Sequence, residues 1–270
     1  MIPKIIHYVW VGDRPKPKSV LKCIKSWKKY CPDWRIKEWG NEIFDDIKCQ
    51  FVHDAIQEKK WAFVSDYVRL YALKKFGGVY MDTDVEITAP LDEFLKHDFF
   101  LGHEKYYDKF SVSTALIGAV PDHHIIGGLI RMYDNMQFIN PDGSLNMTPN
   151  PQLFCKYFEE NLNAPDLHIG TDTITLDENC VIYPWWYFCI PSKGKQNWAI
   201  HHFDGSWLDT WDRKDKEKIK IGKRTIVIAR FYKRYKSGQA ITLNTDEKML
   251  FKMPWFNKRF YVFALKVEAK

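Results

Sequence analysis

The sequence lacks the features that mark several common classes of protein. Its six cysteines form no CxxC pair, and no His/Cys cluster has the spacing of zinc ligands. No uncharged stretch reaches the roughly 20 apolar residues that a transmembrane helix needs. The opening residues, MIPKIIHYVW, have no basic segment ahead of a long apolar run, so we expect no signal peptide. Internal repeats and low-complexity segments are also missing. We therefore expect reduced thiols and a cytoplasmic protein.

Positive charge is concentrated at the C-terminal end of the chain. The net charge is +6, yet residues 213–270 alone hold 17 Lys and Arg against 5 Asp and Glu. The spacing predicts a basic helix over Thr225–Tyr235, and Met249–Leu265 interleaves aromatic residues with Lys and Arg. Such a tail suits an anionic surface, either nucleic acid or lipid, while a solvated basic helix packed on the domain is an equal alternative. We predict a main domain over 1–212 and a basic helical extension over 213–270.

Apolar runs near the start of the chain alternate between strand and helix patterns. Ile5–Val11 is a continuous apolar run typical of a buried strand. Val20–Tyr30 has helical spacing, with Ser19 as its N-cap, and Trp34–Trp39 alternates like a second strand. A strand, a helix and a strand at this spacing predict an α/β domain with a mainly parallel sheet.

The clearest helix pattern leads into two acidic residues. Trp61–Phe76 repeats apolar residues at helical spacing, and Gly77-Gly78 gives a C-terminal stop. Val79–Ile87 then alternates as one strand, with Asp82 and Asp84 on the same face. Two carboxylates pointing the same way are costly unless a cation lies between them, and Mg²⁺ or Mn²⁺ fits. The alternative is a strand end with solvated acids.

Asp66 and Arg69 lie three residues apart on one face of that helix. Arg69 suits a phosphate or the two acids, and Asp66 suits sugar hydroxyls. An ordinary ion pair within the helix is the alternative, and it would contribute little.

These motifs together resemble the sugar-binding and DXD region of family 32 glycosyltransferases, which have the GT-A fold. That family includes bacterial capsule and lipopolysaccharide transferases and fungal mannosyltransferases, and its core is similar to that of the large clostridial glucosylating toxins. The opening residues 2–12 look like the family's first strand, and residues 201–207 look like its closing motif. The residues that carry the resemblance are Ala62, Ser65, Asp66, Arg69, Gly77, Gly78, Tyr80, Asp82 and Asp84.

The resemblance implies a role for each matching residue. Asp66 and Arg69 would hold the donor sugar, while Asp82 and Asp84 would bind the metal, Asp82 also contacting the ribose. A histidine of the closing motif would complete the metal shell, and strand alternation turns only one of His201 and His202 inward. We predict His202, because it lies three residues before Gly205, as in related closing motifs that contain a histidine. The remaining donor-binding residues would be Trp10 on the nucleobase, Tyr80 beside the nucleotide, and Ser206 and Trp207 on the diphosphate.

The resemblance also implies an activity. We expect a GT-A-like fold, Mn²⁺ or Mg²⁺, and transfer of a hexose from a nucleotide diphosphate sugar, with UDP favoured over GDP and retention of anomeric configuration. The acceptor would be a glycan or lipid-linked oligosaccharide in capsule, exopolysaccharide or O-antigen synthesis. We place the protein at the inner face of the cytoplasmic membrane, bound through its basic extension, and expect no nucleic acid partner. Ser113 or Thr114 would replace an Asn that relatives often carry near the donor sugar.

Two other functions remain open from the residues. An aspartate-based phosphohydrolase also places Asp-x-Asp after an apolar strand, but its pattern wants Thr or Val where this chain has Glu86. A basic, aromatic-rich protein that binds lipid or RNA without catalysis would depend on the extension instead.

Overall fold

The computed structural model describes residues 1–106, 109–162 and 164–203, and the backbone of 216–221, 224–229, 250–252 and 259–263. The chain divides into two compact units, Met1–Asp204 and Gly205–Lys270. The predicted boundary after residue 212 lies slightly beyond this division.

A seven-stranded mixed sheet forms the centre of the first unit, with strand order β2-β1-β3-β6-β5-β8-β7. Strands β6 and β7 run against the other five, which are parallel to one another, so the sheet is mixed and mainly parallel as predicted. The strands are β1 (Ile5–Val9), β2 (Arg35–Trp39), β3 (Gly78–Met81), β5 (Phe99–Tyr106), β6 (Lys109–Ala119), β7 (Ile174–Asp177) and β8 (Cys180–Tyr183).

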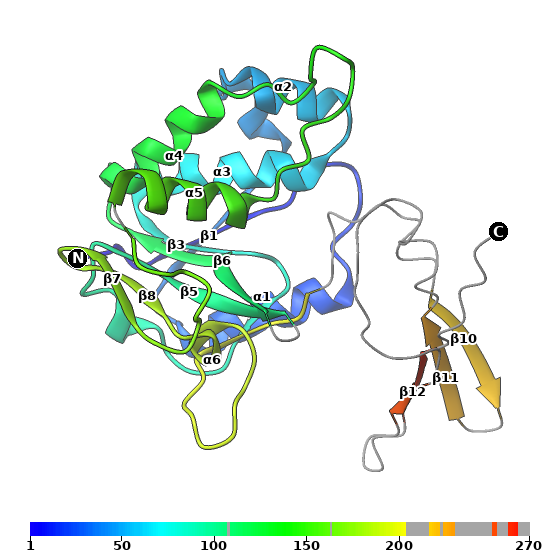
Figure 1. Ribbon diagram of the computed structural model, residues 1–270. Helices are drawn as coiled ribbons and strands as arrows, with labels where there is room; N and C mark the ends of the chain where they lie inside the picture. Colours follow the sequence, from blue (N-terminus) through cyan, green and yellow to red (C-terminus); the bar gives the residue numbers. More distant parts are fainter. Residues whose placement is uncertain are drawn as a thin grey trace. The chain divides into compact units, whose positions relative to one another are not determined.

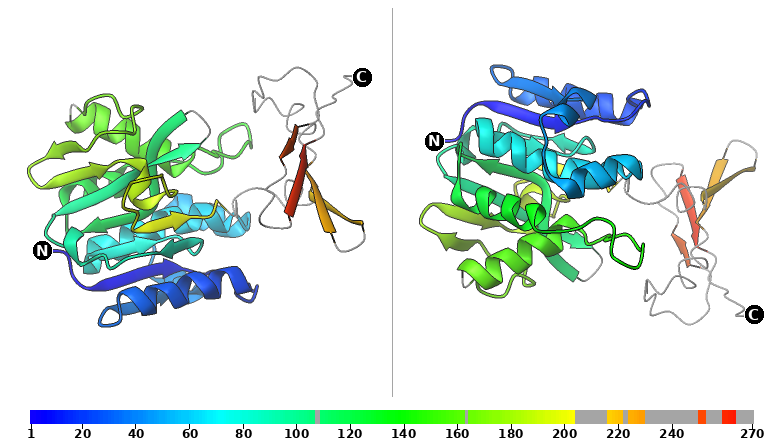
Figure 2. Two further views of the ribbon diagram at one scale, coloured as in Figure 1. Left: turned by 90° about the horizontal axis from the view of Figure 1, so that it is seen from below. Right: turned by 90° about the horizontal axis from the view of Figure 1, so that it is seen from above.

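Helices cover both faces of this sheet (Figure 1). One face carries α2 (Gln50–Gln57), α3 (Trp61–Phe76), α4 (His124–Asp134) and α5 (Asn150–Leu162). The other carries α1 (Lys18–Tyr30), α6 (Trp185–Phe188) and a two-stranded sheet of β4 (Val85–Ile87) and β9 (Ala199–His201), as Figure 2 shows from opposite sides. Short 3-10 turns cover Asn41–Asp45 and Asp92–Phe94.

Each face of the sheet has its own apolar core. Phe63 and Val68 of α3 pack into the first core, and Trp27 of α1 packs into the second. Strand β3 lies between the two cores, and all four of its residues are buried. Strand β3 is therefore packed on both sides, and this fixes the position of Asp82, the residue that follows it.

Two local predictions for this unit are wrong. The predicted strand Val79–Ile87 is two strands, because the Val85 amide donates to the Asp82 carbonyl and closes a turn over residues 82–84. Helix α1 begins at Lys18 with Pro17 as its N-cap, so Ser19 lies inside the first turn. The predicted helix Trp61–Phe76 has the bounds of α3.

The second unit contains a four-stranded sheet with strand order β10-β11-β13-β12. Its strands are β10 (Lys216–Ile221), β11 (Arg224–Ala229), β12 (Leu250–Lys252) and β13 (Arg259–Phe263). The predicted basic helix over Thr225–Tyr235 is wrong where β11 covers it, and its remainder lies outside the described residues. Thr225, Ile226, Val227 and Ile228 are all β-branched, which favours a strand over a helix. Among the described residues, no helix combines the length and apolar character needed to cross a bilayer.

Candidate metal and donor-sugar site

The Gly77-Gly78 pair sets the path from helix α3 to strand β3. Both glycines have positive φ, +59° and +105°. A Cβ on Gly78 would lie 2.6 Å from the Ile5 carbonyl oxygen, so the strand can approach β1 this closely only with glycine. His7 Nε2 donates to the Gly77 carbonyl oxygen at 2.8 Å, because a carbonyl oxygen can only accept. Helix and strand are thereby locked into a tight turn that brings their polar residues together.

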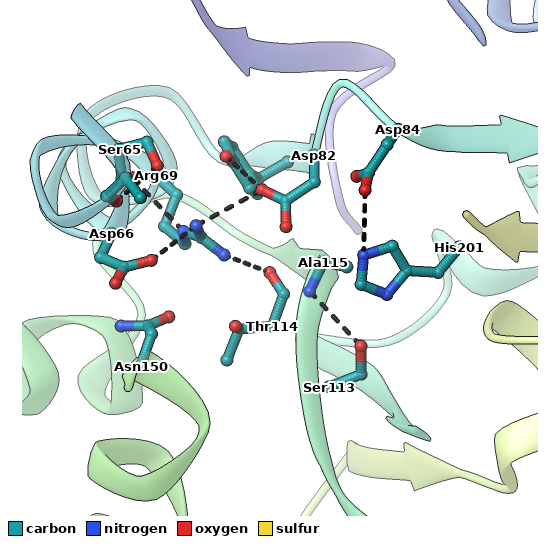
Figure 3. A network of polar contacts seen from close by, with 12 residues as sticks. Ser65, Asp66, Arg69, Asp82, Asp84, Ser113, Thr114, Ala115, Asn150 and His201 are labelled. Atoms are coloured by element: carbon teal, nitrogen blue, oxygen red, sulfur yellow. Dashed lines mark hydrogen bonds and ion pairs between the residues drawn. The ribbon is translucent and has the colours of Figure 1, made fainter. Parts of the chain in front are cut away.

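Arg69 is the centre of a buried polar network that joins α3, β3 and β6 (Figure 3). Its side chain is only 4% exposed, and its Nη2 lies 2.7 Å from Asp66 Oδ1 and 3.3 Å from Asp82 Oδ1. Its Nη1 donates to the Thr114 carbonyl at 2.6 Å. The guanidinium carbon lies 4.6 Å from the centre of the Tyr80 ring, whose hydroxyl donates to Asp82 Oδ1 at 2.7 Å. The ion pair expected within the helix thus extends to the first aspartate of the DXD motif.

Asp82, Asp84 and His201 lie together and have the composition of a metal site, and these three residues are the metal group. One ligand atom from each lies within 4.8 Å of the others. His201 Nε2 lies 3.5 Å from Asp84 Oδ2, and its buried Nδ1 has no hydrogen-bond partner among the described residues. Two carboxylates and an imidazole suit Mn²⁺ or Mg²⁺, with positions left for phosphate oxygens. The residues therefore fit the divalent ion that the motif implies.

His201, not His202, is the histidine that the structure brings to the two aspartates. In the β4–β9 pair His201 lies opposite Val85, and the His202 amide donates to the Asp84 carbonyl at 3.0 Å. The side chain of His202 instead contacts Glu86 at 2.9 Å, on the exposed side of the strand. Strand alternation does turn only one of the two histidines inward, as expected. The prediction of His202 is wrong, because it was based on the spacing to Gly205, whereas the pairing of β9 with β4 decides which histidine faces Asp84.

Negative charge is in excess around this group. Burial and the charge of Asp82, opposed by Arg69, raise the pKa of Asp66 to about 6. Burial raises the pKa of Asp82 against the effect of Arg69, and the charge of Asp84 adds to the rise. Burial lowers the pKa of His201, but Asp84 and Asp82 outweigh it and the net shift is upward. These carboxylates are stabilised by added positive charge, which a divalent ion would supply.

Glu104 is a member of this environment that the sequence reasoning missed. Burial and the charge of Asp82, opposed by His201, raise the pKa of Glu104 to about 7. It lies on β5, paired with Ser111 of β6. The only carboxylate in the run FFLGHEKY was the available signal.

The other predicted residues are placed with varying completeness. Trp10 is half-buried, donates to the Arg14 carbonyl at 2.8 Å and has the Lys16 ammonium 5.9 Å from its ring centre. Tyr80 is buried, its hydroxyl donates to Asp82, and its ring lies against the Arg69 guanidinium. Ser113 and Thr114 are buried on β6, and the Thr114 carbonyl accepts from Arg69. Ser206 and Trp207 lie outside the described residues.

Comparison with known proteins assigns this region. Residues 17–101 match the family described as glycosyltransferase sugar-binding region containing DXD motif. This part of the chain is therefore similar to the sugar-binding region of DXD glycosyltransferases. An uncharacterized glycosyltransferase of Acanthamoeba polyphaga mimivirus is 26% identical over 191 residues, which is 68% of this chain and 74% of the relative. The mannosyl phosphorylinositol ceramide synthase SUR1 of Saccharomyces cerevisiae is 28% identical over 150 residues, 52% of this chain and 37% of that protein.

Two solved glycosyltransferase structures resemble part of this chain. The PaToxG glycosyltransferase matches with a TM-score of 0.46 and 21% identity over 59% of this chain and 69% of that one. A glycosyltransferase involved in the glycosylation of the major capsid of PBCV-1 matches with a TM-score of 0.45 and 11% identity over 76% and 95%.

In this glycosyltransferase the matched segment supplies Asp66, Arg69, Asp82 and Asp84, while His201 comes from beyond it. The match favours sugar transfer over both the phosphohydrolase and the binding protein without catalysis. The Arg69 network joins the metal group on one side to Asp66 on the other (Figure 3).

Proposed function

We propose that the protein is a metal-dependent glycosyltransferase that moves a hexose from a nucleotide diphosphate sugar to a glycan or lipid-linked acceptor. The observation that carries this proposal is the continuity of the polar groups. Asp84 and His201 lie at one end, Asp82 in the middle, and Arg69 with Asp66 at the other. This order matches a donor with diphosphate at one end and sugar at the other.

The metal group would hold the divalent ion through Asp82, Asp84 and His201. Bound there, the ion would neutralise the diphosphate and so improve it as a leaving group. The protein's own contribution is positioning. Arg69 is fixed by three partners on two elements, so its guanidinium is preorganised rather than mobile.

The proposed transfer breaks the bond between the anomeric carbon and the diphosphate oxygen and forms a bond from that carbon to an acceptor hydroxyl oxygen. The proton of the acceptor hydroxyl leaves with the diphosphate. We propose retention of configuration by same-face attack, as the resemblance implies.

Two donor classes are proposed for testing. The resemblance to toxin-like cores favours a UDP-hexose, whereas the yeast relatives bear mannosyl in their names, which supports a mannose donor. Both are nucleotide diphosphate hexoses, and Asp66 would accept hydrogen bonds from the hydroxyls of either.

A panel of UDP- and GDP-sugars, each assayed for donor hydrolysis with Mn²⁺, with Mg²⁺ and with chelator, tests the proposal. We expect consumption of at least one donor with metal and none with chelator. Asp84→Asn should abolish it, while the matched variant Asp172→Asn, at an exposed loop position, should be active. The proposal fails if no donor is consumed, or if Asp84→Asn is fully active.

We further propose that the basic extension binds an anionic membrane, where a lipid-linked acceptor for capsule, exopolysaccharide or O-antigen synthesis would reside. The support is the basic composition of residues 213–270, which hold 17 Lys and Arg but only 5 Asp and Glu. Neutralising Lys233, Arg234 and Lys236 together should weaken sedimentation with anionic liposomes and leave donor hydrolysis unchanged. Unchanged sedimentation would argue against this placement.

A further inference from the structure

The histidine of the metal group has one ring nitrogen without a partner. His201 Nε2 lies 3.5 Å from Asp84 Oδ2, and Figure 3 shows the other ring nitrogen directed away from that carboxylate. This second nitrogen, Nδ1, is buried and has no hydrogen-bond partner among the described residues. Buried polar atoms nearly always have a partner, and a metal-bound histidine commonly donates its second ring N–H to a carboxylate. An acceptor close to Nδ1 is therefore to be expected.

Glu104 is a largely buried carboxylate on the face of the sheet that also carries His201. A Cβ on Gly102 would lie 2.9 Å from the Phe188 ring of α6, so Gly102 faces the side of the sheet that holds α6 and β9. Glu104 follows two residues later in β5, beyond the register shift after Leu101, and so faces the same side. No group among the described residues donates a hydrogen bond to its carboxylate.

Cys189, which follows α6, brings the two side chains together. The Lys105 amide, next to Glu104, donates to Cys189 Sγ at 3.5 Å. The His201 amide donates to the Cys189 carbonyl at 2.7 Å. The charge of Glu104 contributes to the upward shift of the His201 pKa, and His201 acts downward on the pKa of Glu104. The carboxylate and the imidazole are therefore neighbours.

Carboxylates on two sides of His201 favour different positions for its proton. Asp84 lies beside Nε2 and favours a proton there, which would occupy the lone pair that a metal ion needs. A carboxylate at Nδ1 favours the other tautomer and leaves Nε2 free to ligate. Glu104 is not itself a ligand, because the described ligand atoms that lie within 4.8 Å of one another do not include its oxygens.

We propose that Glu104 is a positioning residue that accepts a hydrogen bond from His201 Nδ1–H and so keeps Nε2 free for the divalent ion. The Glu104 side chain reaches this contact by rotation about its own torsions, with the backbone of β5 and β9 in place. This inference rests on the proposed metal-dependent function and deepens it. Glu104 lies outside the matched segment 17–101, as His201 does.

Titration of Mn²⁺ in the presence of UDP or GDP measures this role without turnover. Glu104→Ala should weaken Mn²⁺ binding by about 10- to 100-fold, the usual loss when the partner of a metal-bound histidine is removed. Glu104→Gln keeps an oxygen that accepts from Nδ1–H but has no charge, so its loss should be smaller. The matched control is Glu86→Gln, which changes the carboxylate beside His202 and should leave Mn²⁺ binding unchanged.

A double-mutant cycle separates positioning of the imidazole from simple attraction between Glu104 and the cation. If Glu104 acts through His201, Glu104→Ala should add almost no loss of Mn²⁺ affinity in a His201→Ala background. If Glu104 acts only through its negative charge, the two losses should multiply, and the positioning role would be overturned.

The tautomer of His201 gives a second readout that needs neither metal nor donor. At an alkaline pH where the ring is neutral, imidazole nitrogen chemical shifts should show the proton mainly on Nδ1 in the wild type. In Glu104→Ala it should move toward Nε2, beside Asp84. Glu104→Gln has nearly the shape of the native side chain, so it replaces the alanine variant if that one fails to fold, with a smaller shift in the same direction.

The outcomes separate the two proposals. Wild-type Mn²⁺ affinity and an unchanged His201 tautomer in the Glu104 variants would overturn the role of Glu104 and leave the glycosyltransferase function standing. A wild type that consumes no sugar nucleotide would overturn the proposed function, whereas the Mn²⁺ cycle and the tautomer are measured without any sugar nucleotide.

Discussion

His201 Nε2 lies 3.5 Å from Asp84 Oδ2, across the pairing of β9 with β4. The adjacent His202 points the other way, to Glu86. Two neighbouring histidines therefore have opposite environments, and each serves as the control for the other.

His201→Ala should weaken Mn²⁺ binding by at least about tenfold, a loss that even the supporting residues of metal sites cause. His202→Ala should change it little, because that side chain contacts Glu86 rather than the metal group. Calorimetric titration of Mn²⁺ in the presence of a nucleoside diphosphate measures both. The assignment is wrong if the two variants exchange these results.

Arg69→Lys should lower the free energy of unfolding by about 1–3 kcal/mol, because an ammonium cannot reproduce the forked contacts to Asp66, Asp82 and the Thr114 carbonyl. Arg69→Met should cost about 3–5 kcal/mol, since it leaves buried carboxylates without a cation. Urea denaturation measures both. Arg131→Lys, at an exposed position on α4, should be neutral. An Arg69→Lys protein as stable as the wild type would mean that the fork contributes nothing.

The titration of His7 should make the free energy of unfolding depend on pH. Burial lowers its pKa from 6.5 to about 4, and its neutral ring donates to the Gly77 carbonyl and accepts from Trp39 Nε1. The unfolded chain therefore binds a proton at this residue at higher pH than the folded chain does. Stability should be complete above pH 6.5 and fall as the pH drops toward 4, by up to about 3 kcal/mol from this residue.

His7→Gln removes this titration and should give a shallower dependence of stability on pH between 6.5 and 4. The slope should not vanish, because burial also lowers the pKa of His123 to about 4. Urea denaturation at a series of pH values provides the comparison. Parallel curves for the variant and the wild type would exclude His7 as the source.

Gly78→Ala should destabilise the protein by about 3 kcal/mol or more, because it combines a positive φ with a Cβ 2.6 Å from the Ile5 carbonyl oxygen. Gly143→Ala separates these effects: its φ is +81°, but no described heavy atom lies within 4 Å of its Cβ. That control should cost only about 1–2 kcal/mol. Equal losses in the two variants would show that backbone conformation alone matters at Gly78.

Periodicity predicted the parts of the fold that depend on local pattern. Helix α3 is apolar through most of its length and ends at Gly77, so its bounds and the placement of Asp66 and Arg69 could be read directly. The break after Met81 could not, because the residues from Val79 to Ile87 alternate without interruption although the Val85 amide closes a turn on the Asp82 carbonyl. A turn of this kind leaves no mark on the alternation of apolar and polar residues.

The same limit applies to the site residues contributed by distant segments. Whether His201 or His202 faces Asp84 is set by the register of β9 against β4. Neither histidine has a motif that distinguishes it from the other, so only the tertiary arrangement identifies the one that faces Asp84.

The distance along the chain between the DXD motif and its histidine determines when the site comes into being. During synthesis Asp82 and Asp84 leave the ribosome long before His201, which belongs to the last strand of the first unit. A nascent chain therefore holds an acidic pair without its imidazole until β9 pairs with β4. The metal group is thus complete only when the whole first unit has been synthesised and folded.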